Sequence, residues 1–216
     1  MRILGIDGAL GGFSAAVIDG DAYSEAGSDR PDALEAGLGR IAGVLAARGL
    51  ALANLDRVAV GIGPGSFTGV RIAVSYAKAL ALAARLPLSG ISSYDVLTPE
   101  DAPDPVLTVV HGRPGVISAR LRRGGDVRAA AGPVANVLAA LLDDFVSGEL
   151  ALAGNIQDVS FAIAERGIVV RTLPQRAESP ARAVARLALI ADSSSSVHAV
   201  APDYGELPAV MQKESV

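Results

Sequence analysis

The chain has 216 residues, of which half are hydrophobic, a formal net charge of −4 and no cysteine. This length suits one large domain or two small ones, and the acidic balance argues against a nucleic-acid binder that works alone. Without cysteine, disulfides, thiolate nucleophiles and cysteine metal sites are excluded.

A β-hairpin is the first predicted element. Apolar residues dominate 2–7 and 13–19 on either side of a glycine-rich turn, which predicts two strands, and residues 20–25 could add a third. Asp7 ends the first strand beside Gly8, so its carboxylate either belongs to a site or accepts a structural hydrogen bond from neighbouring amides. Because this carboxylate follows the opening residues so closely, we expect no signal peptide and a cytoplasmic location.

A helix is predicted next, from Pro31 to Arg48, with a proline near its first turn and a glycine just past its end. Gly37, Gly39 and Gly43 lie inside it, where each glycine costs about 1 kcal/mol relative to alanine. The pair at 39 and 43, one turn apart, would let a neighbouring backbone come close. The apolar residues that should face the core recur at helical spacing: Leu34, Leu38, Ile41 and Leu45.

The motif Gly-Pro-Gly-Ser-Phe-Thr-Gly-Val-Arg-Ile at 63–72 is the most informative stretch, and we name its first seven residues, 63–69, the signature loop. It lies between an apolar run that predicts a buried strand and a helix that extends to Leu86, so its glycines and proline specify a tight turn. A Walker A loop would need Gly-Lys-Ser/Thr, and a nucleophile elbow would need glycine two residues before and after Ser66; both are excluded. A structural strand-to-helix connector and a weak anion site remain.

The helix that follows is apolar over a wide arc. Its polar residues, at 71, 75, 78 and 85, share one narrow stripe, which leaves an apolar arc of roughly 240°, whereas covering a sheet needs only about 100°. Bulky Ile72, Tyr76 and Leu80 suit the sheet, so the small residues are predicted to meet another helix, in the same chain or in a partner. The predicted partner interface comprises Gly39, Gly43, Val70, Ala73, Val74, Ala77, Ala81 and Ala84.

The second half begins after an acidic, proline-rich boundary at 99–105. A meander of strands, followed by strands that alternate with helices, predicts an α/β sandwich formed twice. We therefore divide the chain into a first subdomain at 1–101, a second, reduced one at 102–192, and a low-complexity turn with a C-terminal tail at 193–216. Strands are predicted at 57–62, 88–91, 106–110, 116–122, 150–153 and 168–171, and helices at 134–146, 156–165 and 180–191.

The sequence predicts neither a metal site nor a catalytic residue. His111 and His198 are isolated, without the spacing of a zinc-binding histidine pair. Asp143 and Asp144 are adjacent on a predicted helix, so their side chains diverge by about 100°. Asp7 is the carboxylate best placed for a site, because it ends a buried strand beside glycines.

The motif at 63–72 resembles the signature of the TsaB (YeaZ) family, the non-catalytic partner in bacterial synthesis of threonylcarbamoyladenosine in tRNA. Residues 3–7, residues 87–93 and Ala-Pro-Asp-Tyr at 201–204 are similar to the same family. The resemblance implies an α/β fold of the actin-like ATPase (sugar kinase/Hsp70) class with two similar subdomains. It also implies an accessory subunit that binds and activates the TsaD-type transferase acting on adenosine 37 of tRNAs that read ANN codons.

Partners follow from the same resemblance. It implies contact with a TsaD-type transferase, with a TsaE-type ATPase through the complex, and with a second copy in a homodimer; tRNA is contacted indirectly, and no membrane is involved. The two helices that carry the predicted interface residues are the implied contact site. The catalytic metal and the threonylcarbamoyl-adenylate would belong to the transferase, so no cofactor of its own is expected, and ATP or ADP at a partner interface stays open.

The nucleotide-binding loops of this fold class are incomplete in the chain. The first hairpin turn follows Asp7 with glycines but has no hydroxyl until Ser14, and the second-half turn at 111–115 lacks a carboxylate to hold magnesium. Two enzymatic alternatives remain. The first is a phosphotransferase or ATP hydrolase of the same fold that uses Asp7. The second and less favoured is a glycoprotease-type metallopeptidase, which would need a histidine pair. The predicted vestigial nucleotide or anion site comprises Asp7, Gly8, Gly65, Ser66 and Thr68.

Overall fold

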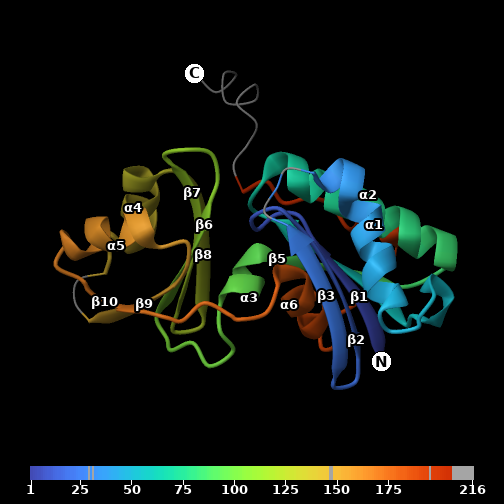
Figure 1. Cartoon of the computed structure of the whole chain (residues 1–216). Coiled ribbons are helices and arrows are strands. Elements are labelled where there is room, and N and C mark those ends of the chain that lie inside the picture. The colour runs from blue at the N-terminus through green and yellow to red at the C-terminus, as the bar shows by residue number, and fades with distance from the viewer. Residues whose placement is uncertain (29, 31, 146–147, 195, 206–216) are drawn as a thin grey trace. The chain divides into compact units, whose positions relative to one another are not determined.

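The computed structural model describes residues 1–28, 30, 32–145, 148–194 and 196–205. The chain divides into two compact units, and each contains one five-stranded sheet (Figure 1). Unit 1 comprises Met1–Val96 and Arg176–Asp203, and unit 2 comprises Leu97–Gln175 and Tyr204–Val216.

In unit 1 the strands lie in the order β3-β2-β1-β4-β5. β1, β2 and β3 are antiparallel neighbours, as the apolar runs around the first glycine-rich turn predict, and β4 and β5 extend the sheet from β1 in parallel. Every residue of β1 from Ile3 to Asp7 is buried, so both faces of this sheet are covered. The strands are β1 (Arg2–Asp7), β2 (Phe13–Asp19), β3 (Ala22–Ser28), β4 (Arg57–Gly63) and β5 (Leu88–Ser92).

Helices cover both faces of the unit 1 sheet. Ile3 and Ala59 pack with the residues of α6, and a Cβ atom added to Gly5 would overlap the carbonyl oxygen of Ala181 in that helix. On the opposite face, α1 packs on β2 and β3, and α2 packs on β4 and β1. The helices of this unit are α1 (Ala33–Ala46), α2 (Phe67–Ala84) and α6 (Pro180–Leu187), with the short elements η1 (Leu52–Asn54), α3 (Ser93–Leu97) and η2 (Val197–Ala199).

Unit 2 repeats this topology. Its strands lie in the order β10-β9-β6-β7-β8, in which β6, β7 and β8 are antiparallel neighbours and β9 and β10 follow in parallel. Leu107, Leu138 and Ile163 belong to a core that α4 and α5 form with the sheet. Two units of one topology confirm the predicted α/β fold with two similar subdomains. The elements are β6 (Val106–His111), β7 (Val116–Arg123), β8 (Asp126–Pro133), α4 (Val134–Leu142), β9 (Glu149–Gly154), α5 (Gln157–Ala164) and β10 (Val169–Thr172).

The division of the chain differs from the predicted one. The predicted second subdomain, 102–192, included the helix that the structure shows as α6, and this helix packs on β1, β2 and β4 of unit 1. The reason lies in β1, whose buried residues point to both sides of the sheet and therefore require a second covering layer. The covering layer comes from a helix that follows unit 2 in the chain, and the order of elements in the sequence does not reveal this.

Two further segments differ from expectation. β8 is not predicted, because its alanines, glycine and charged residues lack the β-branched and aromatic character of most strands. Part of the predicted tail packs on unit 1: Val200 is buried, and the amide of Asp203 donates a 2.6 Å hydrogen bond to the carbonyl oxygen of Ile62. The predicted tail beyond residue 205 lies outside the described residues.

Candidate functional site

The signature loop packs backbone to backbone on the first hairpin turn. A Cβ atom added to Gly69 would overlap the carbonyl oxygen of Gly8, and one added to Gly65 would overlap that of Ala9. Gly65 also has a φ of 153°, which L-residues rarely adopt. The glycines of the loop are therefore needed for close approach of two chain segments.

Three amides around the start of α2 donate hydrogen bonds inside the chain. The amide of Ser66 donates to the carbonyl oxygen of Ala9 at 2.9 Å, and the Ser66 side chain caps the helix by accepting from the amide of Gly69 at 3.2 Å. The amide of Val70 donates to the carbonyl oxygen of Ser66. Thr68 lies in the first turn and is exposed. These contacts support the connector interpretation of the loop, because the amides of Ser66, Gly69 and Val70 already have partners that an anion would have to displace.

Asp7 lies at the end of β1 with only 1% of its surface exposed. Its Oδ1 accepts a 2.9 Å hydrogen bond from the amide of Leu10, whereas Oδ2 is buried without a hydrogen-bond partner in the described part of the chain. A Cβ atom at Gly61 would overlap Oδ2, so glycine makes room for the carboxylate. Burial raises the pKa of Asp7 from its usual 3.8 to about 6, against the lowering effect of hydrogen bonds from the Leu10 and Ala9 amides.

Nucleotide with magnesium, which the fold class implies, does not fit these residues. The orphaned Oδ2 of Asp7 offers one ligand atom, but among the described residues no three histidine, aspartate or glutamate side chains form a group that could hold a metal ion. The backbone of the signature loop lies directly against Gly8 and Ala9. The structure brings Asp7, Gly8, Gly65 and Ser66 together, and their arrangement is that of an internal contact.

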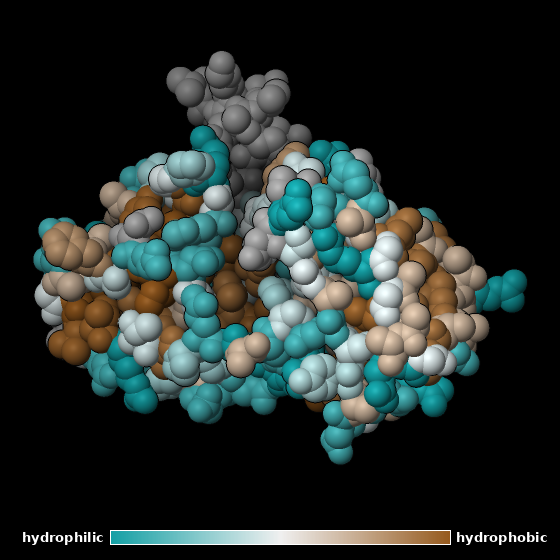
Figure 2. All heavy atoms as spheres, in the orientation of Figure 1, coloured by the Kyte–Doolittle hydropathy of each residue, from teal (hydrophilic) through white to brown (hydrophobic). Residues whose placement is uncertain are grey.

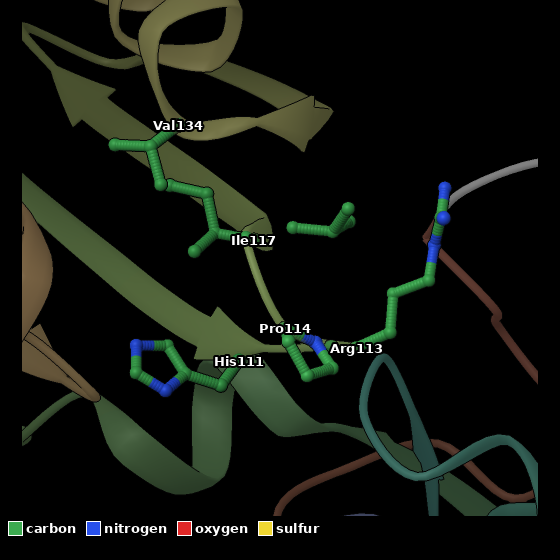
Figure 3. Close-up of a pocket in the computed structure, with 8 residues that line it drawn as sticks. His111, Arg113, Pro114, Ile117 and Val134 are labelled. Atoms are coloured by element: carbon green, nitrogen blue, oxygen red, sulfur yellow. The ribbon is translucent and has the colours of Figure 1, made fainter.

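Unit 2 contains a pocket beside the turn that corresponds to this first hairpin turn. Figure 3 shows its lining, in which His111 at the end of β6 and Arg113 and Pro114 in the turn lie near Ile117 and Val134. The pocket has a volume of about 230 Å³, and none of its lining residues is a carboxylate. The amide of His111 donates to Oδ1 of Asn155 at 3.3 Å. The lining is mainly apolar and does not supply the ligands that magnesium prefers.

The predicted interface residues of α2 are core residues. Val70, Ala73, Val74, Ala77 and Ala81 are buried against the sheet of unit 1, and Ala84 is half-buried. The small residues let α2 approach the sheet closely, so the prediction that they meet another helix is wrong. The length and composition of α2 would suit a membrane-spanning helix, but α2 packs on the sheet of unit 1.

Tyr76, in the bulky sector of α2, contacts both strand β2 and helix α1. Tyr76 contacts the Phe13 ring edge to face, with 6.1 Å between ring centroids. A Cβ atom added to Gly37 would lie 2.8 Å from Cε2 of Tyr76, so this glycine permits the close approach of the two helices. At Gly39 and Gly43 an added Cβ atom would meet nothing within 4 Å, so no backbone of this chain lies against them, and their place in a partner interface stays a prediction. The side chain of Leu34 lies outside the described residues.

The two helices expose a continuous layer to solvent, which we name the outer face. Because their inner sides pack on the same side of the sheet, their exposed sides point outward together. Figure 2 shows apolar side chains, in brown and tan, gathered over the part of unit 1 where Figure 1 places α1 and α2. Leu38 and Leu82 are each 52% exposed, so the prediction that Leu38 faces the core is wrong. The exposed residues of the outer face include Leu38, Gly39, Ala42, Gly43, Phe67, Arg71, Ala79, Leu82 and Ala83.

Replacing Asp7 by asparagine should stabilise the protein at neutral pH. Because the folded pKa lies above the unfolded one, the folded state binds more protons between about pH 4 and 6, and stability falls as pH rises through this window. Above pH 6 the buried charge lowers the free energy of unfolding by about 3 kcal/mol. Urea denaturation of Asp7→Asn and wild type should show a difference that is large near pH 7.5 and shrinks towards pH 4. A difference that does not vary with pH would show that the carboxylate is solvated.

Comparisons with known proteins agree on one family. A family model described as "TsaD: tRNA N6-adenosine threonylcarbamoyltransferase" matches residues 36–200. The "tRNA threonylcarbamoyladenosine biosynthesis protein TsaB" of Escherichia coli is 38% identical over 94 residues, which cover 43% of this chain and 41% of that protein. The Haemophilus influenzae protein of the same description is 50% identical over 50 residues, which cover 23% of this chain and 21% of that protein. The matches thus span about two fifths or less of the length of these relatives.

A solved structure resembles the whole chain. YeaZ from Pseudomonas aeruginosa superposes with a TM-score of 0.67 at 22% identity, and the match covers 94% of this chain and 99% of that one. At this identity the likeness shows a shared fold.

Proposed function

Because the chain belongs to the TsaB (YeaZ) family, we propose that it is a non-catalytic accessory subunit in the synthesis of N6-threonylcarbamoyladenosine in tRNA. One observation carries the non-catalytic part of the proposal. The signature loop uses its helix-capping amides internally and lies against the first hairpin turn, while the outer face exposes apolar side chains to solvent. Used amides in the loop and exposed apolar side chains beside it favour contact with another protein over catalysis.

The proposed role is to bind and activate a TsaD-type transferase that modifies adenosine 37 of tRNAs reading ANN codons. The transferase would hold the catalytic metal and the threonylcarbamoyl-adenylate, and a TsaE-type ATPase would join through the complex. This chain would contact tRNA indirectly in the cytoplasm. It needs no cofactor of its own in this role, and any ATP or ADP would lie at a partner interface.

The outer face is the proposed docking surface, either for the transferase or for a second copy of the chain. Leu38 and Leu82 would lose their exposed apolar area on docking, which favours association by roughly 25 cal/mol per Å² buried. Gly39 and Gly43 leave open space above α1, so that the backbone of a partner helix can come near. The predicted interface thus keeps its two glycines and replaces the buried residues of α2 by exposed ones.

Reconstitution with the purified transferase tests this proposal. We expect tRNA modification to require both proteins, and Leu38→Glu to abolish binding and activation because it places a charge in the apolar contact. Val127→Glu is the matched control, since Val127 is 61% exposed on β8 of unit 2. Full activation by Leu38→Glu would contradict the docking surface. Turnover of magnesium-ATP by the chain alone, lost in Asp7→Ala, would contradict the non-catalytic role.

A further inference from the structure

The carboxylate of Asp7 lies on the side of the unit 1 sheet that α6 covers. Ile3, Gly5 and Asp7 alternate along β1 to the same side, and the first two pack on α6. Oδ1 of Asp7 accepts a hydrogen bond from the amide of Leu10, whereas Oδ2 has no hydrogen-bond partner in the described part of the chain. A charge buried in this way is costly, and the cost falls if the carboxylate reaches water.

The charged side chains on the elements around Asp7 have partners elsewhere or face solvent. Arg57 of β4 donates to the carbonyl oxygen of Ala191 at 2.8 Å, and Asp203, beside the end of β4, is exposed. Among the described residues, Asp7 is the one charged residue in the buried core. The others on these elements are Asp19, which pairs with Arg2, Arg71 and Lys78 of α2, directed to the Phe67 ring and the carbonyl oxygen of His198, and Arg182 and Arg186 of α6, both paired with Glu178.

A short glycine-rich turn, residues 8–12, follows Asp7 and holds its carboxylate. Gly11 and Gly12 have φ values of 78° and 95°, and Gly11 is exposed, with nothing within 4 Å of an added Cβ atom. Leu10 is half-buried at the edge of the core beside α6. Because this turn buries little apolar surface, it can open at a lower free energy than the whole fold.

The same turn is joined to the signature loop. The amide of Ser66 donates to the carbonyl oxygen of Ala9 at 2.9 Å, and the backbones of Gly8 and Gly69 are in close contact. Ala9 is next to Leu10, so a movement that frees Leu10 from Asp7 also pulls Ala9 away from Ser66. Ser66 is the N-cap residue of α2, and the start of this helix is therefore connected to Asp7 through two hydrogen bonds.

We propose that the first hairpin turn and the signature loop open together when Asp7 loses its proton to solvent, so that Asp7 is a proton-sensitive switch for the start of α2. The inference concerns the chain alone and is independent of the proposed function. Burial favours the neutral carboxyl in the closed state, whereas water stabilises the charged one in the open state. The closed-state pKa of about 6 lies above the usual 3.8, so opening becomes more frequent as pH rises from about 4 to 6 and levels off above it.

Amide hydrogen exchange followed by NMR in the full chain tests the proposal. Between pH 5 and pH 7.5 we expect the protection of the Leu10 and Ser66 amides to fall by about tenfold in wild type and to stay constant in Asp7→Asn. At pH 7.5 the variant should protect both amides about a hundredfold more than wild type. Asp19→Asn removes an equal charge at the opposite end of β2 and should leave both amides as they are in wild type.

Low concentrations of urea separate local opening from unfolding of the whole unit. Exchange through local opening responds little to urea, because little surface becomes exposed. The amide of Val58, which donates to Pro87 within the buried sheet, should exchange at a higher free energy and with a steep dependence on urea.

Three results would overturn the inference. If Leu10 and Ser66 exchange with the free energy and the urea dependence of Val58, no separate opening exists. If Asp7→Asn protects Leu10 and leaves Ser66 unchanged, Asp7 holds only its own turn and does not control the signature loop. If Asp7→Asn and wild type exchange alike at pH 7.5, the charge on Asp7 does not govern opening.

Discussion

Ala77→Arg is expected to unfold the protein. Ala77 has no exposed surface and lies on the side of α2 that packs on the sheet of unit 1. An arginine there would be buried without a partner, and such a charge removes several kcal/mol from a total stability of about 5–15 kcal/mol. Circular dichroism should show the loss of helical signal at room temperature.

Ala83→Arg is the matched control for this substitution. Ala83 lies on the same helix but is exposed, so its arginine can extend into water and the variant should melt close to wild type. A folded Ala77→Arg variant that had lost only self-association would show that this side of α2 is turned outward. The pair therefore separates a core position from a surface position within two turns of one helix.

Gly65→Val should lower the melting temperature sharply. Its Cβ atom would overlap the carbonyl oxygen of Ala9, and its φ of 153° is unfavourable for a β-branched residue. The substitution would also separate Ser66 from Ala9 and so remove the hydrogen bond that joins the two turns. Thermal denaturation followed by circular dichroism measures the effect.

Gly43→Ala provides the comparison for this variant, because an added Cβ atom there meets nothing and alanine favours a helix by about 1 kcal/mol. We expect Gly43→Ala to melt at or above the wild-type temperature. If Gly65→Val melted like wild type and failed only to bind a partner, the signature loop would be a contact surface rather than a connector.

The sequence predicts the order of elements well where one residue pattern determines them. The glycine-rich turn between two apolar runs predicts the antiparallel pair β1 and β2, and the motif at 63–72 predicts a strand-to-helix turn. The same reasoning misses β8, whose alanines carry no period-two pattern. Sequence reasoning also finds no internal repeat, because the two units have the same strand order but no recognisable similarity in their residues.

The sides of α2 could not be assigned from the helix alone. The width of an apolar arc predicts burial on two sides, but which side meets the sheet depends on how closely the helix can approach it. That distance is set by residues remote in sequence, such as Gly8, whose missing side chain admits Ala73 and Gly69. The unpaired oxygen of Asp7 and the exposure of Phe67 are likewise results of tertiary packing.

The return of α6 to unit 1 has a consequence for the order in which the newly made chain acquires structure. Leu97–Gln175 is one continuous segment, so unit 2 has all its strands as soon as that segment leaves the ribosome. Unit 1 waits for α6, and until then Ile3 and Ala59 on one side of its sheet remain uncovered. The portion synthesised first is therefore completed last, which leaves an apolar surface open to chaperones until α6 has been made.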